Sequence, residues 1–532
     1  MKKLLALLLV LVIAFSCIDG MIVTVNAITD YTTGETANGI GYSIDNETDE
    51  LTVTYADFST TDLVIPAYID GHPVTAIGDN LLNDTPNPNL KSVVIPDTVK
   101  RIGFGAFGNC INLESVVMSD NIEYVEDYAF LNTGLTNNSD QWEDGALYMG
   151  KFLYGVSKDY VGDFIVKNGT KVIGNYCFGG QNRYGCERMT KVSIPDTVVQ
   201  IGLFAFYNCK GLTSIEIPTS VRHIGNCAFG NCSNLSTISI DTSKLTYIGE
   251  TIVSNTPFYY DEDNWQDNVL YLDTAALCGK NTITDLKIRE GTEIIADYAF
   301  ACNDNIVSVS LPSSLRIICQ LAFDDLHSLP EIKLPDGLEY IANNAFDGCD
   351  QLTELDIPES VNHIGLFAFN RTDKLEKLII RNPDCTIIDN HELYAGGAYS
   401  VNPNTTVYGE EGSTAEVFAN NNSVNFVPLF KNSGTTGDCT WTFDSVSGEL
   451  SIKSTNSYNQ KIYGYNYGES PWFSFKDSIK TITVDSNIYS IGDYCFTDCT
   501  SLESVYMPGV YEVGNYAFSG CESLNRVELS SE

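Results

Sequence analysis

The sequence is poor in basic residues and in histidine. Its 532 residues include 30 Lys and Arg against 69 Asp and Glu, so the formal net charge is -39, and there are only 5 His. A negative field of this size repels nucleic acid and anionic lipid, and we therefore predict that neither is a partner. His223 and His363 occupy the same place in a Val-x-His-Ile-Gly repeat, which favours a structural role over catalysis.

The short motifs of catalysis are also missing. The sequence has no His-Glu-x-x-His, Gly-x-Ser-x-Gly or Gly-x-x-x-x-Gly-Lys-Ser/Thr motif. After residue 27 it has no apolar run of the roughly 18 residues that a membrane-spanning helix needs. We predict that the chain is not an enzyme, holds no cofactor or metal, and has no transmembrane segment.

Residues 1–27 have the pattern of a signal peptide. Lys2 and Lys3 precede an apolar stretch at 4–15, and residues 25–27 (Val-Asn-Ala) fit the small-x-small cleavage pattern. The protein is therefore predicted to be secreted and extracellular, or associated with a cell surface. Cys17 raises the alternative of a lipoprotein acceptor, although the Phe two residues before it is too large for the usual motif.

One phrase, Ile-Gly-x-x-Ala-Phe or a near copy, recurs along the rest of the chain. Clear copies lie at 102–107, 201–206, 224–229 and 364–369. The Phe of this phrase recurs every 23 residues at positions 300, 323, 346 and 369. A fixed period of this length indicates a solenoid, in which each coil buries its apolar face on its neighbours. We therefore predict a β-rich repeat solenoid.

A complete unit lies at 212–232. Its Leu-x-x-Ile-x-Ile piece predicts one short parallel strand per coil, which Pro218 ends because it has no N–H for the next ladder bond. Gly225 is expected in a tight turn. Phe229 should stack on the Phe of the next coil, so that an aromatic column runs along the axis.

Departures from the period suggest the domain organisation. Residues 28–62 fit a β-hairpin cap, 63–430 the main solenoid with its closing segment, 431–438 a polar linker, and 439–532 a second β cap with a short second solenoid. Caps are expected because the open end of a solenoid is an aggregation-prone edge. The second solenoid has no visible closing segment, so we expect a fragment or a truncated reading frame.

The full unit resembles the BspA-type leucine-rich repeat. The motif Leu-x-x-Ile-x-Ile-Pro-x-x-Val-x-x-Ile-Gly-x-x-Ala-Phe-x-x-Cys at 212–232 is specific, and the resemblance covers nearly all of the chain from residue 63 onward. Residues 408–415 look like the usual closing segment of such domains. The resemblance implies a leucine-rich-repeat superhelix in a secreted or surface protein, often implicated in adhesion to host proteins or other cells. It implies no shared set of binding residues.

The 16 cysteines would normally suggest disulfides in an exported protein. Several of them, however, follow the repeat Phe by two or three residues: Cys110, Cys209, Cys232, Cys302, Cys349, Cys499 and Cys521. In leucine-rich repeats this position holds a small side chain inside the turn, so we interpret these cysteines as buried free thiols. Disulfides between adjacent coils, such as Cys209 with Cys232, are the alternative.

Two inserted coils resemble each other and supply the candidate binding residues. Trp142 and Tyr148 in one have the same spacing as Trp265 and Tyr271 in the other. Exposed aromatic side chains stack on sugar rings or anchor a protein partner, so we predict these four as binding residues. The alternative is that each Trp packs onto its own coil. The acidic residues at 261–267 are either a solvated loop or calcium ligands.

These patterns favour a non-catalytic protein-binding or adhesion module. A repeat surface suits a ligand that is a host protein, another cell or a glycan. The alternative is a structural or targeting module of a larger exported protein, whose catalytic, dockerin or anchoring domain is absent from this chain.

Overall fold

The structure is a computed structural model that describes residues 31–36, 39–45, 50–56, 60–82, 87–126, 128–137, 142–179, 185–388, 400–429, 431–455 and 460–529. It divides into two compact units, of which unit 1 comprises 1–407 with 417–425 and unit 2 comprises 408–416 with 426–532. The signal peptide predicted at 1–27 lies outside the described residues. Within the described part of the chain, no helix is long and apolar enough to cross a membrane.

The predicted solenoid is confirmed, but most coils of unit 1 carry two short strands instead of one. The Leu-x-x-Ile-x-Ile piece forms one strand, such as β18 (Ser214–Glu216), and the Ile-Gly piece forms another, such as β19 (His223–Ile224). Both pair in parallel with the same strand of a neighbouring coil. The second strand escaped the sequence analysis because two residues are too few to show the alternation that identifies a strand.

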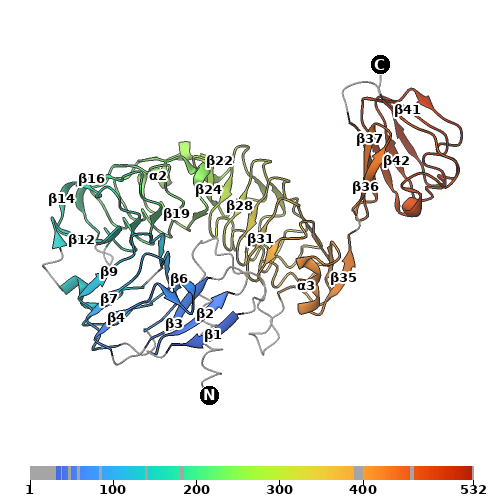
Figure 1. The fold of residues 1–532 in the computed structure, drawn as a ribbon. Coiled ribbons are helices and arrows are strands. Elements are labelled where there is room, and N and C mark those ends of the chain that lie inside the picture. Colours follow the sequence, from blue (N-terminus) through green and yellow to red (C-terminus); the bar gives the residue numbers. More distant parts are fainter. Residues whose placement is uncertain are drawn as a thin grey trace. The chain divides into compact units, whose positions relative to one another are not determined.

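The two kinds of strand lie on opposite sides of the curve of unit 1. Figure 1 shows β6, β19 and β28 on the inner side and β4, β7 and β16 on the outer side, and we call them inner and outer strands. The inner strands are β6 (His72–Ile77), β8 (Arg101–Ile102), β10 (Tyr124–Val125), β15 (Val172–Ile173), β17 (Gln200–Ile201), β19, β21 (Tyr247–Ile248), β26 (Ile294–Ile295), β28 (Ile317–Ile318), β29 (Tyr340–Ile341), β31 (His363–Ile364) and β33 (Thr386–Ile387). The outer strands are β4 (Asp62–Val64), β7 (Ser92–Val94), β9 (Ser115–Val117), β14 (Val161–Ile165), β16 (Arg188–Ser193), β18, β20 (Thr237–Ser239), β25 (Asp285–Lys287), β27 (Ser308–Ser310), β30 (Glu354–Ile357) and β32 (Lys377–Ile380).

Three antiparallel meanders divide unit 1 into sections. Each meander opens an inner sheet that continues with parallel inner strands. The meanders are β1 (Tyr31–Glu35), β2 (Gly41–Asp45) and β3 (Leu51–Tyr55), then β11 (Trp142–Glu143), β12 (Ala146–Met149) and β13 (Phe152–Val156), then β22 (Trp265–Gln266), β23 (Val269–Leu272) and β24 (Ala275–Gly279). We call residues 31–137, 142–256 and 257–388 the first, second and third sections. The predicted cap hairpin is confirmed by β2 and β3, and both inserted coils repeat it inside the solenoid.

The predicted aromatic column forms in the core. Phe206 and Phe229 stack with ring centroids 5.4 Å apart, and Phe323 and Phe346 stack at 5.5 Å. All four rings are fully buried. The contact between these rings repeats from coil to coil, as expected for a solenoid in which each unit supplies the apolar surface for the next.

The glycine of the Ile-Gly piece is required by the close approach of neighbouring coils and not by a turn. A Cβ on Gly225 would lie 2.5 Å from the backbone nitrogen of Leu203, in the preceding coil. Gly202 has the same relation to Asn175, with the two atoms 2.7 Å apart. Neither glycine is among the residues of positive φ. Any larger residue here would push the two coils apart.

The seven cysteines that follow the repeat Phe are free thiols, as interpreted from the sequence, but the burial predicted for all of them is wrong for Cys302, which is exposed, and Cys521, which is half-buried. No disulfide forms among the cysteines of the described residues. The thiols of Cys232 and Cys349 donate to the carbonyl oxygens of Phe206 and Phe323, at 3.0 and 3.1 Å, and so bind the preceding coil. Burial raises the pKa of Cys349 to about 12, so this thiol stays protonated and unreactive at neutral pH.

A short closing segment ends the main solenoid, followed by the strands of unit 2. The closing segment contains β34 (Thr406–Gly409), α3 (Thr414–Asn421) and β35 (Asn425–Pro428). Residues 431–438 were expected to be a linker, but Lys431–Thr436 is strand β36, which pairs with β37 (Cys439–Asp444). Their backbone groups form a full antiparallel ladder, which the polar Gly-containing sequence concealed. The predicted hairpin of β37 and β38 (Glu449–Ser454) is confirmed.

Unit 2 continues as two short parallel sheets. One extends from β38 through β40 (Thr481–Val484), β42 (Ser504–Tyr506) and β44 (Arg526–Glu528). The other contains β39 (Gln460–Ile462), β41 (Ile488–Ile491) and β43 (Glu512–Val513). The remaining elements are β5 (Tyr68–Ile69), α2 (Pro257–Tyr260) and the 3-10 turns Gly134–Asn137, Thr242–Lys244, Glu262–Asn264 and Phe473–Ser478.

Candidate functional site

Trp142 and Trp265 occupy equivalent places in the second and third meanders. Trp142 lies opposite Leu147 and Trp265 lies opposite Leu270, each in the antiparallel pair that opens its sheet. The next pair of strands has the same irregularity, a register shift directly after that leucine. Both indole rings are half-buried. The similarity seen in the sequence therefore corresponds to a repeated structure.

The Trp265 side chain is held by its own coil. Its Nε1 donates a hydrogen bond of 2.8 Å to the carbonyl oxygen of Tyr259, and the two rings meet edge to face with centroids 5.5 Å apart. The Lys280 ammonium lies 4.7 Å from the centroid of the indole. These contacts use the polar group and one face of the ring, so less of Trp265 is available to a ligand than the sequence suggested.

The hydroxyl groups of the two meander tyrosines are bonded to the backbone of their own section. Tyr271 is 4 % exposed, its hydroxyl oxygen accepts a 3.1 Å hydrogen bond from the backbone of Arg289, and the Arg289 guanidinium covers its ring at 4.1 Å. A ring this buried cannot contact a ligand, so the binding role predicted for Tyr271 is corrected to a structural one. Tyr148 is half-buried in the same arrangement, with the backbone N–H of Lys167 bound to its hydroxyl oxygen.

A column of side chains follows the inner strands, and the sequence analysis did not identify it. In each section it consists of residues that lie immediately before the last strand of the meander or before an inner strand, and consecutive members are joined by backbone hydrogen bonds from N–H to carbonyl. In the second section the column contains Lys151, which precedes β13, followed by Lys171, Val199, Arg222 and Thr246. In the third section it contains Thr274, which precedes β24, followed by Glu293, Arg316, Glu339 and Asn362. We call this set the inner column.

The inner column carries different charge patterns in the two sections. In the third section Arg316 lies between two acidic neighbours, 3.2 Å from a Glu293 carboxylate oxygen and 3.4 Å from a Glu339 oxygen. In the second section the column has cations and no carboxylate. Lys171 and Arg222 have no ion pair among the described residues, and the Arg222 guanidinium donates to the backbone oxygens of Thr219 and Val221.

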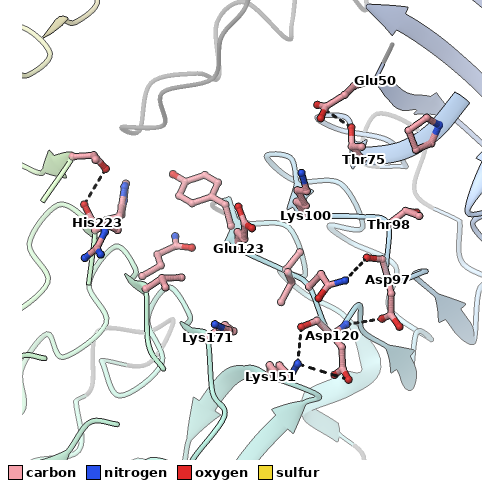
Figure 2. Close-up of a pocket in the computed structure, with 18 residues that line it drawn as sticks. Glu50, Thr75, Asp97, Thr98, Lys100, Asp120, Glu123, Lys151, Lys171 and His223 are labelled. Atoms are coloured by element: carbon pink, nitrogen blue, oxygen red, sulfur yellow. Dashed lines mark hydrogen bonds and ion pairs between the residues drawn. The ribbon is translucent and has the colours of Figure 1, made fainter. Parts of the chain in front are cut away.

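A groove of about 850 Å³ opens on the inner side, where the first and second sections face each other. Figure 2 shows an open space with Lys171 and His223 on the second-section wall and Glu50, Asp97 and Lys100 on the first-section wall. The walls meet at Tyr124 and His223, whose ring centroids are 5.2 Å apart. The groove therefore joins side chains that are far apart in the sequence.

The two walls of the groove differ in charge. The first-section wall carries the carboxylates Glu50, Asp97, Asp120 and Glu123 together with Lys100. The second-section wall carries Lys151, Lys171 and Arg222 and no carboxylate. Lys151 contacts the opposite wall, since its ammonium lies 3.8 Å from a carboxylate oxygen of Asp120 and donates to its backbone oxygen.

The histidines of the repeat are buried, as their shared position predicts. His223 stacks on Tyr247 with centroids 4.3 Å apart, and His363 stacks on Tyr340 at 4.4 Å. Burial lowers the pKa of His363 to about 4, so its imidazole is neutral at physiological pH. Both rings lie at the inner edge of the core.

The acidic groups that suggest a metal are engaged in other contacts. In the 261–267 loop, Asp261 caps the following 3-10 turn, and Glu262 is 3.1 Å from the Lys280 ammonium. Cys302, Asp324 and Asp325 cluster at metal-binding distances, but the guanidinium of Arg371 lies 3.3 Å from Asp324 and 2.9 Å from Asp325. An arginine in this position neutralises the carboxylates that a cation would need.

A family model, the BspA type leucine-rich repeat region, matches the chain over residues 75–182, 154–283, 271–396 and 468–532. The chain belongs to the BspA-type leucine-rich repeat family. The matched residues include every inner-column position from Lys100 to Asn362 and both tryptophan meanders. No curated protein matches the chain.

Solved structures of bacterial leucine-rich repeat proteins are similar to this BspA-type chain. A leucine rich cell surface protein from Faecalibacterium prausnitzii is 24% identical over 68% of this chain and 95% of its own, with a TM-score of 0.26. A leucine-rich repeat protein from Bacteroides ovatus is 20% identical over 94% of this chain and 93% of its own, with a TM-score of 0.22. The pneumococcal vaccine antigen PcpA is 16% identical over 75% of this chain and 98% of its own, with a TM-score of 0.24.

One signal in the sequence would have found the inner column of this BspA-type solenoid. The residue two places before the repeated Ile of the Ile-Gly piece is basic in Lys171 and Arg222 and acidic in Glu293 and Glu339. A charge that varies at a fixed repeat position indicates a side chain at the surface that packing does not fix. The aromatic residues predicted as a binding site lie instead on the meanders, which hold them in place.

Proposed function

We propose that this protein is a non-catalytic binding module that recognises a protein or glycan at an extracellular surface. The observation that carries the proposal is the groove on the inner side of unit 1, whose walls present charged and hydroxyl side chains from two sections of the solenoid. Leucine-rich repeats generally bind through the surface that their stacked coils create, and a concave surface buries more of a ligand than a flat one.

The rigidity of the groove also supports binding. Its side chains stand on inner strands whose backbone groups are bonded from coil to coil, and the core beneath them is filled by buried rings. A ligand that enters such a site orders few additional groups, so little binding free energy is lost to conformational entropy. Secretion remains part of the proposal and is supported by the N-terminal pattern.

The roles predicted for Trp142 and Trp265 remain predictions. Neither residue lines the groove. These half-buried residues belong to the proposal as a second region of contact on the meanders. The groove and the meanders are separate surfaces, so variants in each one distinguish them.

A binding screen tests the proposed function. The full mature chain is applied to arrays of extracellular-matrix proteins and of host and plant glycans, with and without calcium. We expect a saturable ligand whose binding is weakened by Lys171→Glu combined with Arg222→Glu. The affinity of the Trp142→Ala and Trp265→Ala variants for the same ligand shows whether the meanders contribute to binding. Silence on both arrays from a folded sample would contradict the proposal.

A further inference from the structure

The inner column of the second section contains three cations and no carboxylate: Lys151, Lys171 and, beyond Val199, Arg222. Lys151 and Lys171 are neighbours in the column, since the N–H of Lys171 donates to the Lys151 carbonyl at 2.7 Å. Coils joined in this way lie about 5 Å apart, and like charges on directly adjacent strands are destabilising. Asp120 compensates Lys151, but Lys171 and Arg222 have no ion pair among the described residues.

Cations without a carboxylate partner are unusual in a chain as acidic as this one. The chain has 69 acidic residues against 30 basic ones, so a carboxylate is the most available partner for any surface cation. In the third section the same column places Arg316 within 3.4 Å of two carboxylates. The second section has the same backbone and the same column but lacks the acids. Its cations face the groove, where a ligand would meet them.

Resting on the function proposed above, we propose that the groove binds an acidic glycan. Its carboxylate or sulfate groups lie against Lys171 and Arg222 on the second-section wall. Its hydroxyl groups donate hydrogen bonds to the carboxylates of Glu50, Asp97 and Glu123 on the first-section wall. A sugar hydroxyl both donates and accepts, so one chain of sugars satisfies both walls at once.

The composition of the lining favours a glycan over an acidic peptide. Protein interfaces are usually anchored by buried aromatic and apolar side chains, whereas most of the residues that line this groove have charged, amide or hydroxyl side chains. A polyacidic peptide such as poly-glutamate also has no hydroxyl donors for the carboxylates of the first-section wall. An acidic glycan has the anion for one wall and the donors for the other.

The test measures the binding of the full mature chain to four probes by biolayer interferometry. The probes are polygalacturonate, which carries carboxylates, dextran sulfate, which carries sulfates, neutral dextran, and poly-glutamate. We expect saturable binding of polygalacturonate or dextran sulfate, and weak binding of neutral dextran and poly-glutamate. The tighter binder of the first two shows whether the groove prefers carboxylate or sulfate groups. Binding should weaken as salt is raised, because screening acts on exposed charges.

Two variants locate the binding. Lys171→Glu with Arg222→Glu should reduce affinity about tenfold or more, since two favourable charge contacts become unfavourable. Lys191→Glu is the matched control, because Lys191 lies on outer strand β16 of the same section, outside the groove lining. Lys191→Glu should leave affinity unchanged. Both cations of the double variant lie at the surface, and the melting temperature reports whether the fold survives.

Each contrary result has a separate meaning. Equal weakening by Lys191→Glu shows general attraction of polyanions to the protein and overturns the site. If poly-glutamate binds as tightly as the glycans and its binding depends equally on Lys171 and Arg222, the ligand is an acidic peptide. That result overturns the assignment of the ligand as a glycan. If the arrays yield a ligand whose binding depends on the groove while no acidic glycan binds, that result overturns the acidic-glycan inference and leaves the proposed function standing.

Discussion

The second and third sections of unit 1 share a scaffold and differ in what they display on it. Both open with the same meander, both stack phenylalanines in the core, and both continue as parallel inner strands. In the third section the inner column neutralises itself around Arg316. In the second section the column is basic and faces an acidic wall across a groove.

This difference shows how a solenoid separates stability from recognition. The positions that point inward are fixed by packing against the next coil, so they repeat. The side chains of the inner column point away from the core, so their charges can vary without disturbing the packing. Two sections with nearly the same interior therefore present a self-neutralised surface in one place and a charged groove in another.

The largest expected effect tests whether the two interiors are equivalent. Phe229→Ala and Phe346→Ala each remove a fully buried ring, and we expect each to lower the free energy of local unfolding by about 3–5 kcal/mol. Hydrogen exchange of the flanking coils measures this loss section by section. Tyr68→Ala, at a side chain that is 61 % exposed, is the control. A much smaller cost in one section would show that the sections are packed differently.

Acid should destabilise the third section through His363. The pKa of this buried imidazole is about 4 in the folded protein, below its ordinary value near 6.5. The unfolded chain therefore binds the proton first, and stability that is present above pH 6.5 is lost as the pH falls toward 4. The loss approaches about 3 kcal/mol. Thermal melts between pH 7 and 4 check it, and His363→Phe, which keeps a flat ring, should make the curve flatter.

Trp265→Ala tests whether the third meander serves stability or binding. The change removes the hydrogen bond to Tyr259, the edge-to-face contact and the contact with Lys280, so we expect a loss of about 1–2 kcal/mol. Differential scanning calorimetry gives the change, and the array ligand gives the change in affinity. An unchanged melting temperature with lost binding would restore Trp265 as a ligand contact.

The smallest expected change in stability concerns the inner column of the third section. Arg316→Ala removes two ion pairs of partly exposed groups, and we expect a loss of about 0.5–1 kcal/mol that shrinks as salt is added. Melts at low and high salt measure it. Affinity for the groove ligand should stay constant, because Arg316 is not part of the groove lining. A drop in affinity would extend the binding surface into the third section.

The repeated architecture and its core could be predicted from the sequence alone. The spacing of Phe300, Phe323 and Phe346 is the coil length, and a ring repeated at that spacing must stack on its neighbours. The alternating residues before and after a turn predicted the hairpin of β2 and β3 in the same way. These features are local, because each depends on residues within one coil or on the coil beside it.

The groove, in contrast, depends on the folded arrangement of residues far apart in the sequence. Lys100 and Lys171 line one groove although 71 residues separate them in the chain. Their proximity depends on the curvature of unit 1, which accumulates from a small rotation at every coil and from the meander that restarts the sheet at β11. No single repeat encodes that sum. The sequence could therefore specify which side chains stand on the inner strands, and only the folded chain could bring two sets of them face to face.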